Sequence, residues 1–323
     1  TLRRSSAASD VYKRQPNGNG PGDYEDDGKT HLPEDDPKRI FSLTEKSVDF
    51  IRKQVEQDQP FYLQLSHYAM HIWHDSLAQT RQKYKQLPKG RKHEEKDDLP
   101  EEEIPIATFN HGWMINYASM LDDLDRALGT LLDTIDELGI SDSTYVLLTS
   151  DNGGGFRGNA PLKAGKGSLY EGGIRMPSFV RGPGIEAGSY SKVPVVQWDF
   201  LPTFYDLAGG TEPLPDDLDG GSVRSVFEKG DKGRVKRNTK DLIFHFPWHT
   251  GVAESVIRSG NYKLRKDLDS LEVELFDIEK DWEENHDLAK KFPKIVKKLD
   301  RRRSAYLEQV NAETVTLTRR NYV

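Results

Sequence analysis

The chain has 323 residues, of which 31% are charged, and carries a formal net charge of −7. A chain of this length can bury a substantial core and form one large or two smaller domains. The negative charge balance excludes the broad basic surface that nucleic-acid binding requires. No apolar run approaches the ~20 residues of a membrane-spanning helix, so we expect no membrane span.

The N-terminal segment, residues 1–40, shows no pattern that predicts a helix or a strand. Residues 1–15, TLRRSSAASDVYKRQ, are polar and aperiodic, and lack the apolar centre of a signal peptide. We interpret them as an artefactual or disordered leader. Residues 16–40 are rich in Gly, Asn, Pro and Asp, which predicts a loop. The chain contains no cysteine, so it forms no disulfides.

The first predicted elements are a helix, a strand and a second helix. Residues 42–45, SLTE, have the spacing of a capping box and predict a helix that ends near Gln57. Residues 61–65 read as a buried strand that runs into a segment with three histidines. Residues 77–103 are charged and predict a surface excursion with some helix. Apolar residues at steps of three and four from Tyr117 to Leu138 predict a long helix that Gly139 ends.

A strand at residues 145–148 follows that helix and runs directly into a polar, glycine-rich loop. The alternation of helix, strand and polar loop predicts an α/β fold. In such folds active groups collect at the carboxyl ends of the strands. Both candidate loops, after Leu65 and after Leu148, have this position.

The remaining pattern predicts a smaller C-terminal subdomain. A polar junction at residues 213–240 divides a catalytic part, residues 41–212, from a subdomain at 241–323. Within the catalytic part we expect strands at 176–180 and 191–197 and a helix at 199–207. In the subdomain we expect strands at 242–246, 255–258, 262–265 and 274–278, and a mostly helical segment at 282–310.

The run LLTSDNGGGFRGNAPLKAGKGSLYEGGIRMPSFVRGPG, residues 147–184, carries the strongest chemical signal. Asp151 and Asn152 offer adjacent hard oxygen ligands, which suit Ca²⁺ or Mg²⁺ better than a soft metal. Lys166 lies between two glycines, so an anion can approach its ammonium without side-chain crowding. Metal ligands followed by an accessible cation indicate a site for a small oxyanion. A polar, glycine-rich turn is the alternative.

This run resembles the sulfatase family of the alkaline-phosphatase superfamily. The resemblance rests on TSDNGG at residues 149–154, followed by PLKAGKGSLYEGGIRMP at 161–177, and extends over about residues 36–289. It implies a sandwich with a mostly parallel sheet flanked by helices. It also implies a small α+β subdomain, with an antiparallel sheet packed by a C-terminal helix.

The resemblance implies a role for each candidate site residue. Asp151 and Asn152 match ligands of one divalent cation, usually Ca²⁺, and Lys166 matches the lysine that binds the sulfate. His71, in SHYAMH, matches a histidine that contacts the sulfate and assists the leaving group. Met70 stands where many sulfatases have proline, which departs from the pattern. The weaker substrate-binding candidates are His67, His74 and His245, and a packed strand histidine is an equal alternative for His245.

The family's nucleophile motif is absent from the sequence. Sulfatases attack with formylglycine made from the first residue of C/S-x-P-x-R, but this chain has no Cys and no Pro preceded by Ser at two positions before it. We therefore interpret the chain as the C-terminal portion of an arylsulfatase-like enzyme, truncated at its N-terminus and inactive alone. The alternatives are a natural pseudoenzyme and a phosphatase or phosphodiesterase of the same superfamily.

The substrate implied by the resemblance is a sulfated small molecule or sulfated carbohydrate. The family resemblance also leads us to expect a secreted, periplasmic or lysosomal protein. Neither the particular sulfate ester nor the oligomeric state follows from the sequence, because the pocket loops that select a substrate follow no general pattern.

Overall fold

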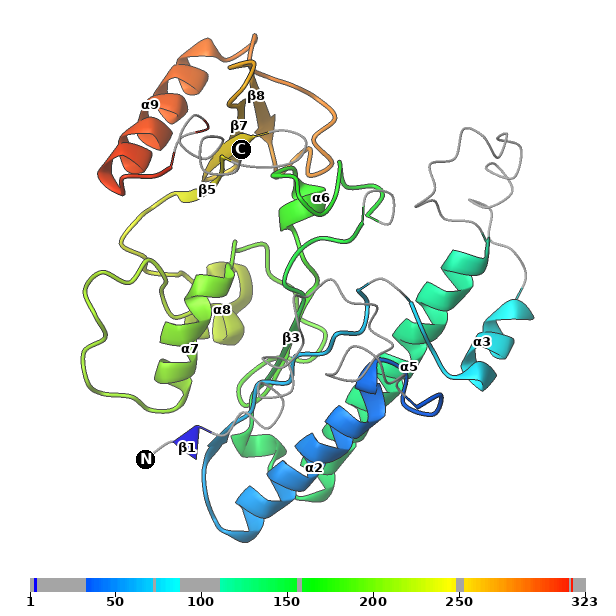
Figure 1. The fold of residues 1–323 in the computed structure, drawn as a ribbon. Coiled ribbons are helices and arrows are strands. Elements are labelled where there is room, and N and C mark those ends of the chain that lie inside the picture. Colours follow the sequence, from blue (N-terminus) through cyan, green and yellow to red (C-terminus); the bar gives the residue numbers. More distant parts are fainter. Residues whose placement is uncertain are drawn as a thin grey trace. The chain divides into compact units, whose positions relative to one another are not determined.

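The computed structural model describes residues 33–71, 74–87, 111–155, 159–247, 253–313 and 315, and the backbone of Arg3 and Arg4 (Figure 1). The chain forms two compact units, Thr1–Thr144 and Tyr145–Val323. Most of the predicted surface excursion, and most of the predicted leader and loop at residues 1–40, lie outside the described residues. Of the leader, the structure describes β1 (Arg3–Arg4), which pairs in parallel with β2 (Phe61–Tyr62). The strand predicted at residues 61–65 thus ends at Tyr62, three residues earlier than expected.

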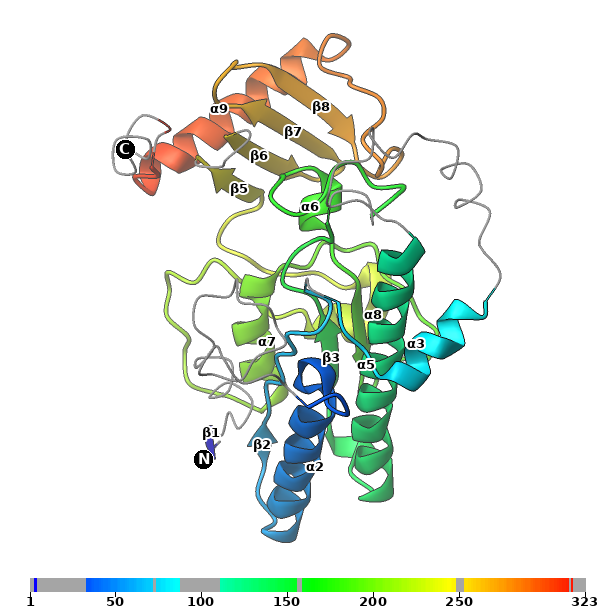
Figure 2. The ribbon, with the colours of Figure 1, turned by 45° about the vertical axis from the view of Figure 1, so that its right-hand side comes forward.

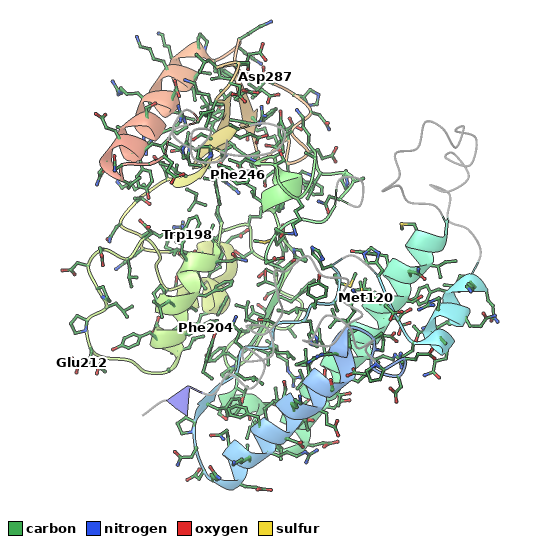
Figure 3. The ribbon with its side chains drawn as sticks, viewed as in Figure 1. Met120, Trp198, Phe204, Glu212, Phe246 and Asp287 are labelled. Atoms are coloured by element: carbon green, nitrogen blue, oxygen red, sulfur yellow. The ribbon has the colours of Figure 1, made fainter. Side chains whose placement is uncertain are left out.

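Helices form the core of the first unit. The long helices α2 (Ile40–Glu56) and α5 (His111–Glu137) pack against each other, and the short helix α3 (Ala78–Lys85) packs against α5. Their core is made of the buried side chains Ile40, Met120 and Ala127; Figure 3 labels Met120. Two short 3₁₀ turns, η1 (Pro37–Arg39) and η3 (Ser141–Ser143), flank this helical layer in sequence.

The ends of the two long helices show one correct and one wrong prediction. Gly139 follows α5 with φ +66°, the left-handed conformation that glycine adopts without strain, so the predicted helix end is confirmed. The capping box at residues 42–45 is wrong, because α2 begins earlier, at Ile40. The Asp36 carboxylate accepts hydrogen bonds from the backbone N–H groups of Phe41 (2.9 Å) and Ser42 (3.2 Å) and satisfies the first turn instead.

The second unit begins with an antiparallel strand pair, β3 (Val146–Thr149) and β4 (Ser178–Arg181). The mostly parallel sheet expected from the sequence is not seen in the described residues. A parallel partner would need a crossover that returns the chain to the start of β3. Here the intervening segment, which contains the one-turn helix α6 (Glu171–Ile174), returns the chain beside the end of β3.

The predicted strand at 191–197 is also wrong, because that segment joins no sheet. Pro194 lacks the N–H that a ladder needs, and the chain turns into η4 (Gln197–Asp199) and α7 (Phe200–Leu207), the helix predicted there. The ring of Trp198, which Figure 3 labels, lies 5.6 Å from the ring of Phe244 in the strand that follows the polar junction. The polar junction contains the helix α8 (Arg224–Lys229) and the turn η5 (Gly230–Lys232). The domain boundaries predicted from composition stay a prediction.

The C-terminal sheet agrees closely with the sequence. Its strands β5 (Leu242–Phe246), β6 (Glu254–Ser259), β7 (Tyr262–Asp267) and β8 (Val273–Asp277) pair antiparallel in chain order. Helix α9 (Pro293–Gln309) lies along one face (Figure 2). The core between helix and sheet contains Ile257, Leu264, Leu275 and Leu299.

Two local features shape this subdomain. Gly260, with φ +58°, is the first residue of the two-residue turn between β6 and β7, which confirms the predicted hairpin. The helical segment expected from residue 282 begins only at Pro293, because proline fits the first helical turn but not a helix interior. Among the described residues no helix combines the length and the apolar character needed to cross a membrane.

A buried ion pair fixes the segment between α7 and β5. Asp199 is fully buried and forms a two-point contact with the Arg237 guanidinium, at 2.5 Å and 2.8 Å. The same carboxylate accepts hydrogen bonds from the backbone N–H groups of Val196 (2.9 Å) and Gly221 (3.1 Å). Arg237 thus holds the polar junction against the start of α7.

We predict that Asp199→Asn lowers the free energy of unfolding by about 3 kcal/mol, because it leaves the Arg237 charge buried without its partner. Chemical denaturation measures the change. The control Glu228→Gln removes an ion pair to Arg224 whose two side chains are 39% and 44% exposed, and should cost less than about 1 kcal/mol. Equal losses in the two variants would contradict the structural role of the buried pair.

Candidate functional site

The Asp151–Asn152 pair follows β3 after one intervening residue, Ser150, where the chain leaves the strand. The Asp151 side chain is exposed and Asn152 is partly buried. Gln197 donates its side-chain amide to the backbone carbonyls of Ser150 (3.1 Å) and Asp151 (3.3 Å). Ser150 Oγ donates to the carbonyl of Asn152 at 3.0 Å. The loop that carries both candidate ligands is therefore held by side-chain contacts to its own backbone.

The donor set suits a hard cation. Asn152 Nδ2 donates to the carbonyl of Gly153 at 2.8 Å, which leaves the amide oxygen as an acceptor. Among the described residues, neither that oxygen nor the Asp151 carboxylate receives a hydrogen bond. A carboxylate and a carboxamide oxygen fit Ca²⁺, which takes six to eight oxygen ligands, so they supply part of a coordination sphere. No group of three or more His, Cys, Asp or Glu that could hold a metal occurs within the described ranges.

Glycines let three backbone segments touch at this loop. The N–H of Gly153 donates to the carbonyl of Gly173 at 2.9 Å. A Cβ atom on Gly153 would lie 1.9 Å from the carbonyl oxygen of Gly172, and one on Gly172 would lie 2.3 Å from that of Lys163. A Cβ on Gly173 would lie 2.0 Å from the carbonyl oxygen of Ser168. Since real Cβ atoms do not approach so closely, only glycine fits these positions.

This packing brings the Lys166 loop against the Asp151–Asn152 loop. The backbone N–H of Lys166 donates to the carbonyl of Gly154 at 2.8 Å, while its side chain is exposed. The Asn159 amide group donates to the carbonyls of Gly154 (3.0 Å) and Gly172 (2.5 Å) and links the same segments. The adjacent candidates Asp151 and Asn152 and the later candidate Lys166 thus belong to one cluster of loops.

The histidines predicted from SHYAMH lie in the first unit. The backbone N–H of His71 donates to the carbonyl of Tyr68 at 3.1 Å, and their rings lie 5.2 Å apart. Met70, which replaces the usual proline, has φ +76°, so the backbone turns sharply just before His71. The His74 ring packs edge-on against Tyr117 at 5.3 Å.

Two of these histidines are held neutral. Burial lowers the pKa of His67 to about 4, although the Asp36 carboxylate acts to raise it. Both ring nitrogens of His67 are buried without a hydrogen-bond partner in the described part of the chain. Burial and the charge of Lys38 lower the pKa of His74 to about 4. Neutral rings at these positions can accept or donate a hydrogen bond without adding charge.

His245, in β5, has a structural contact. Its Nε2 atom lies 2.8 Å from the carbonyl oxygen of Glu313, beyond the end of α9. This contact ties the segment after α9 to the sheet and accords with the packed-histidine alternative. The role of His245 toward a substrate stays a prediction.

Sequence reasoning missed the charged residues that attach the lysine loop to the C-terminal sheet. Lys263, fully buried in β7, lies 2.9 Å from Glu171 and 2.8 Å from Glu284. Burial acts to raise the pKa of Glu171, but Lys263 holds it below its ordinary value. Burial raises the pKa of Glu284. In β7, Lys263 and Arg265 are charged residues at alternate positions, a pattern that also suits an exposed sheet face.

The family follows from a comparison with known proteins. Residues 4–210 match the family model described as sulfatase, which covers more than half of the chain. The chain belongs to the sulfatase family. Residues 165–310 match the model described as N-sulphoglucosamine sulphohydrolase, C-terminal. The resemblance read from TSDNGG and PLKAGKGSLYEGG is therefore confirmed.

One curated sulfatase is similar to this chain in sequence, and two solved structures are similar to it in fold. A sulfatase from Formosa agariphila is 27% identical over 314 residues, which cover 88% of this chain and 53% of that protein. The chain thus spans about half the length of this relative. The crystal structure of Ps i-CgsB has a TM-score of 0.68 at 24% identity and covers 95% of this chain and 64% of that one. BT4656, solved with D-glucosamine-2-N,6-O-disulfate, has a TM-score of 0.68 at 22% identity, with 88% and 72% covered.

We predict that Gly153→Ala lowers the free energy of unfolding by at least about 2 kcal/mol, because its Cβ must displace the Gly172 carbonyl. Gly155→Ala is the matched control, since no atom of the described residues lies within 4 Å of a Cβ there. We expect the control to change stability by less than about 0.5 kcal/mol. Urea denaturation of both variants tests this, and equal stability of the two would show that the loops are not packed backbone to backbone.

We predict that stability falls as the pH drops from 6.5 to 4, because the unfolded chain protonates His67 in this range and the folded chain does not. The contribution is fully present above pH 6.5. It changes by at most about 1.4 kcal/mol per pH unit. In His67→Gln the dependence of the unfolding free energy on pH should be shallower. An NMR titration that gives His67 a pKa near 6.5 in the folded chain would refute the prediction.

Proposed function

We propose that this sulfatase-family chain carries part of the metal site and part of the sulfate site of a sulfuric ester hydrolase. The observation that supports this most is the backbone contact between Gly154 and Lys166, 2.8 Å long. It joins the loop with the Asp151 and Asn152 oxygens to the loop with an exposed ammonium. A cation and a lysine on adjacent loops would hold the negatively charged sulfate group of an ester between them.

The chemistry of each residue follows from its type. Asp151 and Asn152 would hold a Ca²⁺ ion, which when bound withdraws negative charge from the sulfuryl oxygens, while formylglycine in the family provides the nucleophile. Lys166 would neutralise the nonbridging or leaving oxygen as the S–O bond breaks. His71 would donate a proton to the departing alcohol, as histidine can near neutral pH. His67, His74 and His245 are proposed to contact substrate.

The nucleophile must come from outside the motifs of this chain, because the sequence has no C/S-x-P-x-R. We infer that the chain alone binds a sulfate group without turning it over. The same absence favours a second candidate, a sulfatase-like binding protein that keeps the anion site and performs no hydrolysis. Turnover restored by a nucleophile supplied with the rest of a sulfatase domain would favour the hydrolase. Sulfate binding without turnover under the same conditions would favour the binding protein.

The proposed substrate class is a sulfated carbohydrate. BT4656 was solved with a disulfated glucosamine as its substrate, and Ps i-CgsB was solved in complex with k-i-k-neocarrahexaose. The identities of 22% and 24% show the fold alone, so the proposed substrate class rests on this chain's own matches to the sulfatase model and to the N-sulphoglucosamine sulphohydrolase C-terminal model. Sulfated small molecules share the same reacting group and are the alternative.

We predict that Ca²⁺ shifts the backbone NMR signals of residues 151–154, and that inorganic sulfate shifts those of residues 165–168. Asp151→Ala should weaken the Ca²⁺ response at least about tenfold, because it removes the charged ligand. Lys166→Ala should do the same to the sulfate response. An aryl sulfate should not be hydrolysed by the chain alone.

Two controls accompany these titrations. Asp217→Asn and Lys290→Ala change exposed charges outside the loop cluster and should leave both responses intact. Shifts of equal size in Asp151→Ala and the native chain would rule out the calcium site. Hydrolysis of an aryl sulfate by the native chain would contradict the inferred need for an outside nucleophile.

A further inference from the structure

The two lysines of the KAGK segment have different surroundings. Lys163 Nζ lies 3.4 Å from Glu274 Oε1 and 3.5 Å from the carbonyl oxygen of Glu284. It also lies over the Tyr170 ring, 4.3 Å from its centroid. The Lys166 side chain, by contrast, is exposed and makes no ion pair or hydrogen bond among the described residues. The fold therefore engages one lysine and leaves the other available to an anion.

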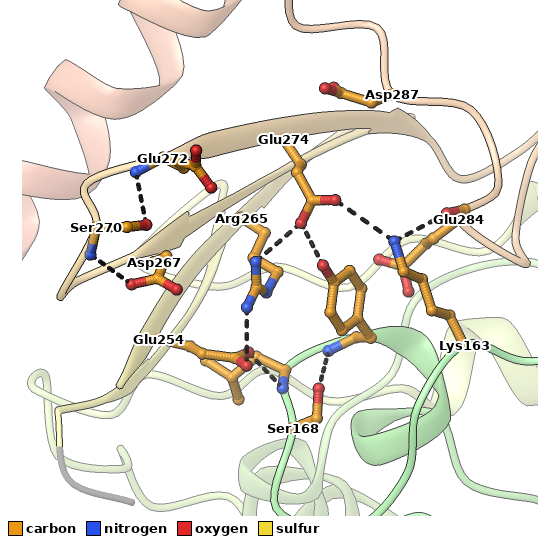
Figure 4. A network of polar contacts seen from close by, with 12 residues as sticks. Lys163, Ser168, Glu254, Arg265, Asp267, Ser270, Glu272, Glu274, Glu284 and Asp287 are labelled. Atoms are coloured by element: carbon orange, nitrogen blue, oxygen red, sulfur yellow. Dashed lines mark hydrogen bonds and ion pairs between the residues drawn. The ribbon is translucent and has the colours of Figure 1, made fainter. Parts of the chain in front are cut away.

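Three charged residues form a ladder across the C-terminal sheet, one on each of three neighbouring strands. Arg265 in β7 is paired in register with Glu274 in β8 and contacts it at 2.8 Å. On its other side Arg265 contacts Glu254 of β6 at 3.0 Å. Figure 4 shows Arg265 between the two glutamates. The side chains of Arg265 and Glu254 are only 10% and 5% exposed, so solvent screens this ladder weakly.

Both ends of the ladder hold the lysine loop just after Lys166. Glu254 accepts a hydrogen bond from the backbone N–H of Leu169 at 2.9 Å. Glu274 accepts a hydrogen bond from the Tyr170 hydroxyl. Two cations lie over the Tyr170 ring, with Arg265 at 4.4 Å and Lys163 at 4.3 Å from its centroid. The loop is thus fixed three residues before Lys166 and three and four residues after it.

A second attachment follows immediately in sequence. Glu284 accepts a hydrogen bond from the backbone N–H of Glu171 at 2.5 Å, and both carboxylates contact the buried Lys263 ammonium. Since buried charges need compensating partners, this group fixes the start of α6 against β7. Lys166 therefore lies in a short segment whose freedom is limited on both sides.

We propose that the Glu254–Arg265–Glu274 ladder is a positioning device that holds the Lys166 loop in place for the sulfate group. Through Glu274 it also binds Lys163, so that Lys163 does not compete with Lys166 for the sulfate. The proposal rests on the proposed function of Lys166. Its physical basis is that a fixed cation binds an oxyanion without first losing the conformational freedom of its loop. The ladder would thus act on sulfate binding without touching the sulfate.

The test uses the whole chain, inorganic sulfate as the probe, and the variants Glu274→Gln and Tyr170→Phe. Glu274→Gln weakens the contacts to Lys163 and Arg265, while Tyr170→Phe removes only a hydroxyl and keeps the ring. We expect Glu274→Gln to speed amide hydrogen exchange of Lys166 and Ser168 about tenfold and to weaken sulfate binding by a similar factor. Tyr170→Phe should change both in the same direction by less.

Glu272→Gln is the matched control. Glu272 has the same charge and precedes β8 by one residue, and Figure 4 shows its side chain apart from the ladder. It should leave exchange and binding unchanged. In a Lys166→Ala background, Glu274→Gln should weaken sulfate binding no further, because the ladder acts through that lysine.

The exchange and binding measurements separate two kinds of failure. If the native chain does not bind sulfate, the proposed function fails, and amide exchange in the free chain still tests the positioning. Unchanged exchange in both Glu274→Gln and Tyr170→Phe would overturn the proposal. So would faster exchange with unchanged sulfate affinity, or an equal loss of affinity in the Lys166→Ala background.

Discussion

Direct contact between backbone segments at Gly153, Gly172 and Gly173 is the constraint on which the candidate site depends. Any side chain at Gly153 would meet the Gly172 carbonyl at 1.9 Å, so the loops could not close to hydrogen-bonding distance. Their closure brings the backbone of Lys166 against that of Gly154 and so joins the metal-ligand loop to the lysine loop. Glycine carries no functional group, yet it determines where the functional groups lie.

Charge fixes the other side of the same lysine loop. Removing Lys263, Glu171 and Glu284 from water costs free energy that their mutual attraction only partly offsets. Removing one member of such a group would leave an uncompensated buried charge, so the three side chains hold one arrangement. Here the arrangement sets how the loop before α6 meets strands β6 to β8. A loop that carries a binding group gains from such an anchor, because loops are otherwise the most mobile parts of a fold.

The sequence predicted best the elements whose signals are local. The hairpin at Gly260 and the end of α5 at Gly139 depend on a residue that tolerates positive φ, and both were placed correctly. Predictions failed where a distant or competing residue decided. The Asp36 carboxylate, rather than the residues of the SLTE box, caps the start of α2. The last helix begins only at Pro293, eleven residues after the predicted start at residue 282. Periodicity cannot report which of several nearby polar groups reaches a helix end.

The same distinction between local signals and distant contacts holds for the candidate site. The sequence by itself determined the family, the hard oxygens at Asp151 and Asn152, and a glycine-flanked cation at Lys166, because these follow from residue types in a short, ordered motif. Only the tertiary structure decided that Lys163 is engaged by Glu274, and that Arg265 joins Glu254 to Glu274. The partners of Lys163 lie more than a hundred residues away along the chain, and strand register rather than local spacing brings them together. Which charges meet is therefore a property of the folded sheet.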